Sequence, residues 1–181
     1  MIITISGLPG SGKSTVGKML AEKLGYRFYS VGDLRGKWAL EKGMTINELN
    51  ELGENEEWTD KKADECQTEI GKRDDNLVID GRLAFHFIPN SFKVFLAVDP
   101  DEGARRIFKD NSGKRSDEKK VGLKQLRSGL EERIKSDEKR YKKYYGLDFR
   151  DKGHYDLVID TTRLEPDEVV SKILKAIKSI H

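Results

Sequence analysis

The segment IITISGLPGSGKST, residues 2–15, decides the fold of this chain. Residues 2–6 are mostly apolar and β-branched, which predicts a short strand buried on both faces. Residues 13–24 follow a helical pattern that stops at Gly25. Where these two elements meet, the sequence satisfies the pattern G-x-x-x-x-G-K-[ST] of a phosphate-binding loop. Its four fixed positions are Gly7, Gly12, Lys13 and Ser14.

The chemistry of this loop suits a nucleoside triphosphate. Glycines let successive backbone N–H groups point at phosphate oxygens, and the following helix adds the positive end of its dipole. Lys13 would reach the β and γ phosphates, and Ser14 would help to hold Mg²⁺. A strand before the loop and a helix after it argue against a glycine-rich turn with an incidental lysine, so we expect ATP here as phosphoryl donor. The residues expected to contact the nucleotide are Gly7, Leu8, Pro9, Gly10, Ser11, Gly12, Lys13, Ser14 and Thr15.

Four further apolar runs have the length and composition of strands. They cover residues 26–30, 76–80, 93–98 and 156–160. Helical patterns lie between the strands, at 13–24, in two or three helices over 33–73, at 100–109, at about 116–145 and at 165–180. This alternation predicts an α/β protein of the P-loop NTPase class, with a five-stranded parallel sheet and helices on both faces.

Two crossovers between strands are much longer than the roughly 10–12 residues that a crossover needs. One joins the second strand to the third and is acidic over residues 41–69. The other joins the fourth strand to the fifth and is basic over residues 101–152. We interpret both as functional insertions within a single domain that spans residues 1–181.

The composition restricts the partners and the compartment. The chain has 34 Lys and Arg residues against 32 Asp and Glu residues, and its net charge of +2 calls for neither nucleic acid nor membrane. The single cysteine, Cys66, has no partner for a disulfide, and no run of about 18 apolar residues predicts a membrane span. We expect a cytoplasmic monomer whose partners are small-molecule nucleotides, with no nucleic acid and no membrane.

Polar side chains suited to a metal or a phosphate follow two of the predicted strands. Asp80 ends the third strand in VIDG, beside the phosphate-binding loop, where a carboxylate can orient Mg²⁺ through water. An ordinary strand-end aspartate is the alternative. Arg82, in DGRLA, could grip two oxygens of a second phosphate with its forked guanidinium. Asp33, in SVGDLR after the second strand, lies near the position of a helix N-cap.

The long helix predicted at about 116–145 carries a stripe that we expect to face the core. Arg133, Asp137 and Arg140 lie within a sector of about 60° on this helix. They could form a surface ion network, worth only about 0.3–0.5 kcal/mol per pair. Alternatively, the arginines point at the transferring phosphates, and Asp137 positions them or touches the acceptor. The apolar members of the stripe are Leu123, Leu126, Leu130, Ile134, Tyr141 and Tyr144.

The chain resembles the nucleoside monophosphate kinases, and most closely the archaeal-type cytidylate kinases. The similarity extends over nearly the whole chain, through ISGLPGSGKST, SVGDLR, KGMT, VIDGRLA, RRI, ERIKSDEKRYKKYYGLD and YDLVIDTTRL. The spacing R-x-x-x-D-x-x-R at residues 133–140 resembles the cytidylate branch rather than adenylate kinase. The resemblance implies an acceptor insertion at about 33–75, which binds the nucleoside monophosphate, and a lid at about 108–122.

The resemblance also implies roles for single residues. Ser30 and Asp33 would border the monophosphate pocket, and Arg82 would bind the α-phosphate of the acceptor. Arg106 would lie at the entrance to the lid, near the adenine of the donor. The residues implied to clamp the phosphates during transfer are Arg133 and Arg140.

One position departs from the pattern of the family. Many relatives have an arginine three residues after the aspartate of GD, where this chain has Gly36. Arg35 comes one residue earlier, and on a helix that shift rotates the side chain by about 100°. The sequence leaves open whether Arg35 reaches the acceptor phosphate.

A second helical face concerns the acceptor base. Asp60, Asp64 and Gln67 share this face through their i, i+4, i+7 spacing, and the resemblance places the helix near the base. Cytosine offers an exocyclic amine that donates and a carbonyl that accepts, so a carboxylate and an amide could read it. A solvated acidic face is the alternative.

We expect the transfer of the γ-phosphoryl group of ATP to CMP or dCMP, giving CDP or dCDP and ADP. Positioning and charge neutralisation supply the catalysis in this chemistry. The enzymatic alternatives are an adenylate kinase and a broad kinase that also accepts UMP. A nucleotide-dependent switch is disfavoured because the chain has no N-K-x-D segment. RNA binding is disfavoured because arginines that face phosphates already explain the basic crossover.

Overall fold

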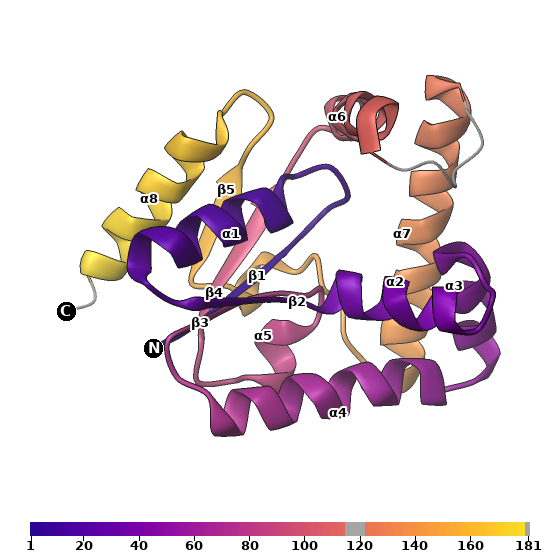
Figure 1. Cartoon of the computed structure of the whole chain (residues 1–181), viewed down its shortest axis with the longest axis horizontal. Coiled ribbons are helices and arrows are strands. Elements are labelled where there is room, and N and C mark those ends of the chain that lie inside the picture. Colours follow the sequence, from indigo (N-terminus) through magenta and orange to yellow (C-terminus); the bar gives the residue numbers. More distant parts are fainter. Residues whose placement is uncertain (115–121, 180–181) are drawn as a thin grey trace.

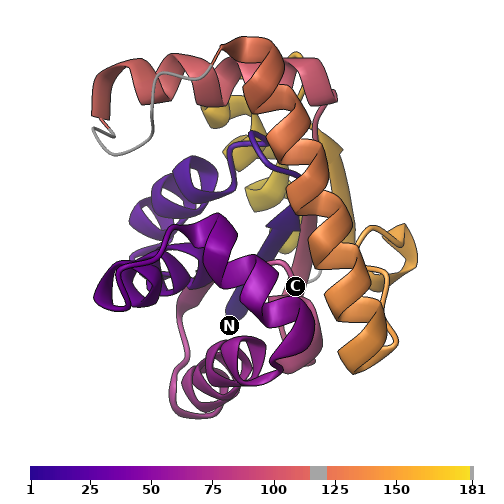
Figure 2. The ribbon, with the colours of Figure 1, turned by 90° about the vertical axis from the view of Figure 1, so that its right-hand side faces the viewer.

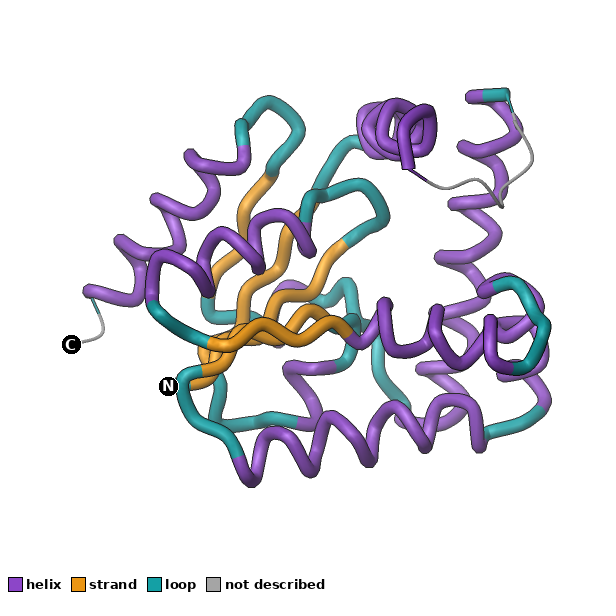
Figure 3. Tube along the Cα trace, in the orientation of Figure 1, coloured by secondary structure: helices purple, strands orange, loops and turns teal. Residues whose placement is uncertain are grey.

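The computed structural model of the chain describes residues 1–114 and 122–179, without the side chains of 111–114. Within these residues, five parallel strands form one sheet in the order β2-β3-β1-β4-β5 (Figures 1 and 3). Each strand begins and ends within one residue of its predicted position, so the predicted sheet is confirmed. The strands are β1 Ile2–Gly7, β2 Arg27–Ser30, β3 Leu77–Asp80, β4 Phe92–Ala97 and β5 Leu157–Asp160.

The helices alternate with these strands, as predicted. The predicted helix at 100–109 extends to residue 114, and the long helix begins at Leu123 because Gly122 is extended. Residues 115–121, part of both the predicted lid and the predicted start of the long helix, lie outside the described residues. Two short elements were not predicted, α5 and a 3₁₀ turn. The helical elements are α1 Lys13–Leu24, α2 Val31–Glu41, α3 Ile46–Asn55, α4 Trp58–Arg73, α5 Ala84–Phe87, α6 Pro100–Lys114, α7 Leu123–Tyr145, the turn Lys152–His154 and α8 Pro166–Lys178.

Helices cover both faces of the sheet (Figure 1). α1 and α8 pack against each other on one face, whereas α4 and α5 lie on the other. Ile3 and Ile5 of the central strand are fully buried in the cluster that α1 and α8 complete. All four residues of β3 are buried, as expected for a parallel strand between helical layers. The sheet therefore provides a rigid base for the loops at its carboxyl edge.

Ser30 both ends a strand and begins a helix. It is the last residue of β2 and the N-cap of α2, and its Oγ accepts the N–H of Asp33 at 3.2 Å. The predicted N-cap position of Asp33 is therefore corrected to Ser30. Asp33 lies in the first turn of α2, where a carboxylate is stabilised by the helix dipole.

α7 stands as a column beyond the carboxyl edge of the sheet, between α6 at one end and α3 and α4 at the other (Figures 1 and 2). Its predicted core-facing stripe is confirmed only in part. Tyr141 packs against the buried cluster that contains Phe149, whereas Leu123 is 41% exposed and the buried residues of α7 are Asp137 and Arg140. The apolar stripe is only half-buried because α7 faces a polar site rather than the core. Even this 23-residue helix is strongly charged, and no helix of the described chain has the length and apolar character to cross a bilayer.

Candidate active site

Two glycines bring the phosphate-binding loop into close contact with its neighbours. Gly7 has φ 148°, and a Cβ there would lie 2.2 Å from the carbonyl oxygen of Leu96. Gly10 has φ 74°, and a Cβ there would lie 2.3 Å from the carbonyl oxygen of Gly103. The loop is therefore seated against β4 and α6, at positions that exclude any side chain. It leads into the first turn of α1, whose N–H groups have no intrahelical acceptors and suit an anion.

Lys13, the first residue of α1, is partly buried at the end of this loop. Its Nζ donates to the carbonyl oxygen of Leu8 at 2.7 Å. Burial lowers the pKa of Lys13 to about 8, and the nearby cations Arg82 and Arg133 add to this lowering while Asp80 opposes it. Cations from three separate segments thus lie near enough to influence Lys13, and an anionic phosphate placed among them would stabilise their charged forms.

Asp80 lies beside the loop, as predicted, because β3 pairs with β1. Ser14 donates a hydrogen bond from its Oγ to Oδ2 of Asp80 at 2.5 Å. Burial raises the pKa of Asp80 against the influence of Lys13 and Ser14, and Asp33 raises it further. A hydroxyl and a buried carboxylate that meet at one point are the oxygen donors that Mg²⁺ prefers, so the residues predicted for the metal fit it.

Arg82 lies opposite the loop, just past the carboxyl end of β3. The Oγ of the buried Ser6 lies 2.9 Å from the carbonyl oxygens of both Gly81 and Arg82, which holds this turn in place. The guanidinium pairs with Asp137 of α7 and lies 5.7 Å from the ring centroid of Phe149. Its side chain is 12% exposed, so the structure brings this predicted residue to the site as a buried cation.

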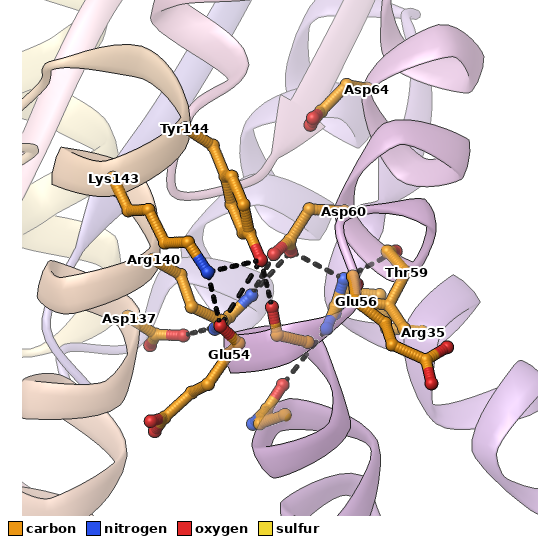
Figure 4. Close-up of polar contacts among 12 residues, drawn as sticks. Arg35, Glu54, Glu56, Thr59, Asp60, Asp64, Asp137, Arg140, Lys143 and Tyr144 are labelled. Carbon is orange, nitrogen blue, oxygen red and sulfur yellow. Dashed lines mark hydrogen bonds and ion pairs between the residues drawn. The ribbon is translucent and has the colours of Figure 1, made fainter.

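Asp60, Asp137 and Arg140 form a buried ionic cluster between α4 and α7 (Figure 4). Arg140 donates from Nη1 to Oδ1 of Asp60 at 2.5 Å, and from Nη2 to Asp137. Arg140 is 1% exposed and Asp137 is 2% exposed. The alternative of a surface ion network is therefore wrong for these two residues. Charges buried this deeply require partners, and these partners come from both the acceptor insertion and α7.

Arg35 connects the three helices of the acceptor insertion. Its Nη1 donates at 2.9 Å to the carbonyl oxygen of Thr59 and to Oδ1 of Asp60, and its Nη2 donates to Oδ1 of Asn50 at 3.1 Å (Figure 4). Asp60 thus holds Arg35 as well as Arg140. Of the three residues predicted to face the acceptor base, Asp60 is engaged by the arginines.

A cavity of about 30 Å³ lies between the acceptor insertion and Arg82. The predicted residues Asp64 and Gln67 line it together with Arg35 and Asp60. A space of this size holds one or two water molecules. The cavity is therefore too small for a nucleotide in the arrangement that the structure describes.

Arg106 lies on α6, at the other side of the phosphate-binding loop. Its Nη2 donates to the carbonyl oxygens of Thr161 and Thr162, at 2.8 and 3.1 Å, and its Nε lies 3.1 Å from Glu102. Thr161 in turn donates from Oγ1 to the carbonyl oxygen of Ser11 at 3.2 Å. Arg106 is therefore linked to the loop through Thr161. Ser30 lies on the other side of the site, where it is the neighbour of Asp80 in the sheet.

Three residues at the site were not predicted. Tyr145 donates from its hydroxyl to Oδ2 of Asp64, and Tyr144 donates to the carbonyl oxygen of Gly53 at 2.9 Å. A Cβ on Gly53 would lie 2.6 Å from Oγ1 of Thr59, so glycine permits this close approach. The only signal in the sequence was the run RYKKYYG, and its distance from the acceptor insertion along the chain hides these contacts.

The chain is similar to known kinases over nearly its whole length. The model of the cytidylate kinase-like family matches residues 2–163. A cytidylate kinase of Archaeoglobus fulgidus is 37% identical over 179 residues, which are 98% of this chain and 95% of that protein. An S-adenosylmethionine-dependent nucleotide dehydratase of Lacinutrix mariniflava is 40% identical over 174 residues, which are 96% of this chain but 35% of that longer protein. The solved shikimate kinase of Aquifex aeolicus matches with a TM-score of 0.59 and 25% identity, over 98% of this chain and 96% of that one.

Proposed function

Because the chain belongs to the cytidylate kinase-like family, we propose that it transfers the γ-phosphoryl group of ATP to CMP or dCMP. The products are ADP and CDP or dCDP. One observation carries the proposal: Arg82 lies near enough to Lys13 of the phosphate-binding loop to lower its pKa, and it also lines the cavity next to residues 33–75. A cation between a triphosphate site and a second pocket is what transfer between two phosphates needs.

The donor side consists of the loop and the residues beside it. We assign residues 7–15 to the phosphates of ATP, Lys13 to the β and γ phosphates, and Arg106 to the neighbourhood of the adenine. Ser14 and Asp80 would hold Mg²⁺, which when bound would neutralise charge on the β and γ phosphates.

The acceptor side consists of the arginines around the cavity. We assign Arg82 to the α-phosphate of the acceptor, and Arg133 and Arg140 to the phosphates during transfer. Asp137, which pairs with Arg82 and Arg140, holds them in position. Ser30 and Asp33 border the monophosphate pocket, and Arg35, which pairs with Asp60 and lines the cavity, is assigned to the same pocket.

Closure completes the site. We assign residues 33–75 as the acceptor insertion and residues 108–122 as the lid. Their closure over both nucleotides would exclude water, which would otherwise take the γ-phosphoryl group. The catalysis then comes from position and charge, with no covalent enzyme intermediate.

The test is the formation of ADP from ATP and Mg²⁺ with CMP, dCMP, UMP, dTMP, AMP and GMP supplied one at a time. CMP or dCMP should give strong stimulation. Lys13→Ala and Arg133→Ala should each lower turnover by about 100-fold or more, because each removes a charge that stabilises the transferring group.

Other outcomes would contradict specific parts of the proposal. A preference for AMP would make the protein an adenylate kinase. No stimulation by any acceptor would refute the acceptor site and leave only nucleotide binding at the loop. Wild-type turnover by the Arg133→Ala variant would remove Arg133 from the phosphate clamp.

A further inference from the structure

Gln67 carries a buried acceptor atom that has no partner in the described residues. Gln67 is 2% exposed, and its Nε2 donates at 3.3 Å to the carbonyl oxygen of Ala63 and to Oδ1 of Asp64. Because both of these partners are acceptors, the amide nitrogen faces them, and Oε1 therefore points to the opposite side of the amide. Oε1 has no hydrogen-bond donor, and a Cβ on Gly81 would lie 3.0 Å from it. Since buried acceptors are normally paired, this atom indicates a donor that a ligand would supply.

Asp64 presents a second acceptor to the same cavity. Its Oδ1 accepts from Gln67, and its Oδ2 accepts from the hydroxyl of Tyr145. The amide oxygen of Gln67 can only accept, whereas a carboxyl group accepts when ionised and donates when protonated. The pair can therefore present two different patterns of hydrogen bonding to a ligand.

The surroundings of Asp64 bring the pKa of its carboxyl group close to neutral pH. Burial raises the pKa of Asp64 to about 7 and Asp60 adds to it, whereas the hydrogen bond from Tyr145 and the cations Arg35 and Arg140 lower it. These groups come from α2, α4 and α7. From α5, His86 approaches the ring of Tyr145, with 6.2 Å between ring centroids.

The two patterns match the two pyrimidines that form ribonucleotides. Cytosine has an amine at position 4, which donates, and a ring N3 that accepts. Uracil has the opposite pattern, because its carbonyl at position 4 accepts a hydrogen bond and its N–H at N3 donates one. Two acceptors suit the amine of cytosine and repel the carbonyl of uracil. One donor and one acceptor suit the edge of uracil.

We propose that Gln67 and Asp64 select the acceptor base, and that the ionisation of Asp64 sets the choice between CMP and UMP. Ionised Asp64 favours CMP, and protonated Asp64 admits UMP. Tyr145 is a positioning residue, because it orients the carboxyl group from α7 and stabilises its ionised form. This inference rests on the proposed function and deepens it.

The experiment measures kcat/KM for CMP and for UMP between about pH 6 and pH 8, one unit on either side of the pKa. The ratio of the two values cancels every titration that both acceptors share, including those of ATP and of the acceptor phosphate. The ratio of CMP to UMP should rise by up to about 100-fold over this range, because the ionised fraction rises about tenfold while the neutral fraction falls about tenfold.

Three variants isolate the carboxyl group. Asp64→Asn should lower the ratio at pH 8 and remove its dependence on pH, because the amide does not titrate. Tyr145→Phe should move the midpoint to higher pH, because it removes a hydrogen bond that lowers the pKa of Asp64. Glu65→Gln, an exposed position on the same helix, should leave the profile unchanged.

Calorimetry separates failure of this inference from failure of the proposed function. Near pH 7, binding of CMP should release part of a proton and binding of UMP should take one up, whether or not turnover occurs. An active kinase with a flat ratio, or an Asp64→Asn variant with the wild-type profile, would overturn the inference. Equal proton uptake for CMP and UMP would also overturn it, and an intact thermal transition would show that the variants are folded.

Discussion

The charge of Lys13 depends on whether a phosphate lies in the loop. Burial and the cations Arg82 and Arg133 lower its pKa to about 8, and the carbonyl oxygen of Leu8 accepts its hydrogen bond. A bound triphosphate would bring negative charge next to Nζ and raise the pKa. If the loop binds ATP as proposed, ATP and a proton should bind together above pH 8.

This linkage gives a prediction about affinity. The dissociation constant of ATP should increase above about pH 8, approaching tenfold per pH unit, because binding must then take up the proton that Lys13 has lost. Calorimetry in two buffers with different ionisation enthalpies measures both the affinity and the proton uptake. The Lys13→Arg variant keeps its charge and should show a flat dependence over the same range. Constant ATP affinity of the wild-type protein from pH 7.5 to 9.5 would contradict the assignment of Lys13.

At the scale of elements, α7 provides the cap for α3. The last carbonyls of a helix have no intrahelical donor. Tyr144 donates to the carbonyl oxygen of Gly53 at 2.9 Å, and Lys143 donates to that of Glu54 at 2.9 Å (Figure 4). Lys139 adds an ion pair with the Glu54 carboxylate at 2.6 Å. The end of α3 in the acceptor insertion is thus attached to the helix that carries the arginines of the site.

Gly53→Ala tests this interface. The new Cβ would lie 2.6 Å from Oγ1 of Thr59 and 3.3 Å from Cδ of Arg140, so we expect the free energy of unfolding to fall by about 1–3 kcal/mol and the KM for CMP to rise. Urea denaturation and steady-state kinetics measure the two effects. Gly129→Ala is the matched control on α7, because its Cβ would meet nothing within 4 Å and should stabilise the helix by up to about 1 kcal/mol. Equal effects of the two substitutions would show that close packing at Gly53 is unimportant.

At the scale of the whole molecule, the charged residues around the cavity are paired with one another. Arg82 pairs with Asp137, Arg140 pairs with Asp60 and Asp137, and the cavity between them is about 30 Å³. If this is the acceptor site, as proposed, entry of a nucleotide would separate residues 33–75 from α7 and exchange these internal partners for phosphate. α8 lies on the other face of the sheet, away from this movement (Figure 1).

We predict that hydrogen exchange will report this opening in two helices together. Addition of CMP should change the exchange of Ile46–Asn55 and Leu123–Tyr145 to a similar degree, because the end of α3 is bonded to α7. Exchange in Pro166–Lys178 should stay constant, which makes α8 the internal control. A change confined to α3 or to α7 would show that the two helices move independently.

The fold was predictable from the sequence to a large extent, because its signals are local. Five short apolar runs mark the strands to within a residue, and the glycines at 7, 10 and 12 mark the loop. The predictions failed where the environment of a residue depends on a partner that is far away in the sequence. The stripe on α7 has the periodicity of a core-facing helix, yet the most buried members of this helix are the charged Asp137 and Arg140. Periodicity indicates which residues share a face, but the chemistry of that face depends on what lies opposite.

Residues 2–25 alone predict a phosphate-binding loop between a strand and a helix, because backbone conformation and helix start are set by neighbours in sequence. Residues 60, 64, 137 and 140 could be found as candidates from their spacing. Their pairing could not, since Asp60 meets Arg140 at a separation of 80 residues and Asp64 meets Tyr145 at a separation of 81. In the fold, Asp60 pairs with the arginines and Asp64 accepts the hydroxyl of Tyr145. These pairings depend on burial and on the charges of distant helices, which exist only after the chain has folded.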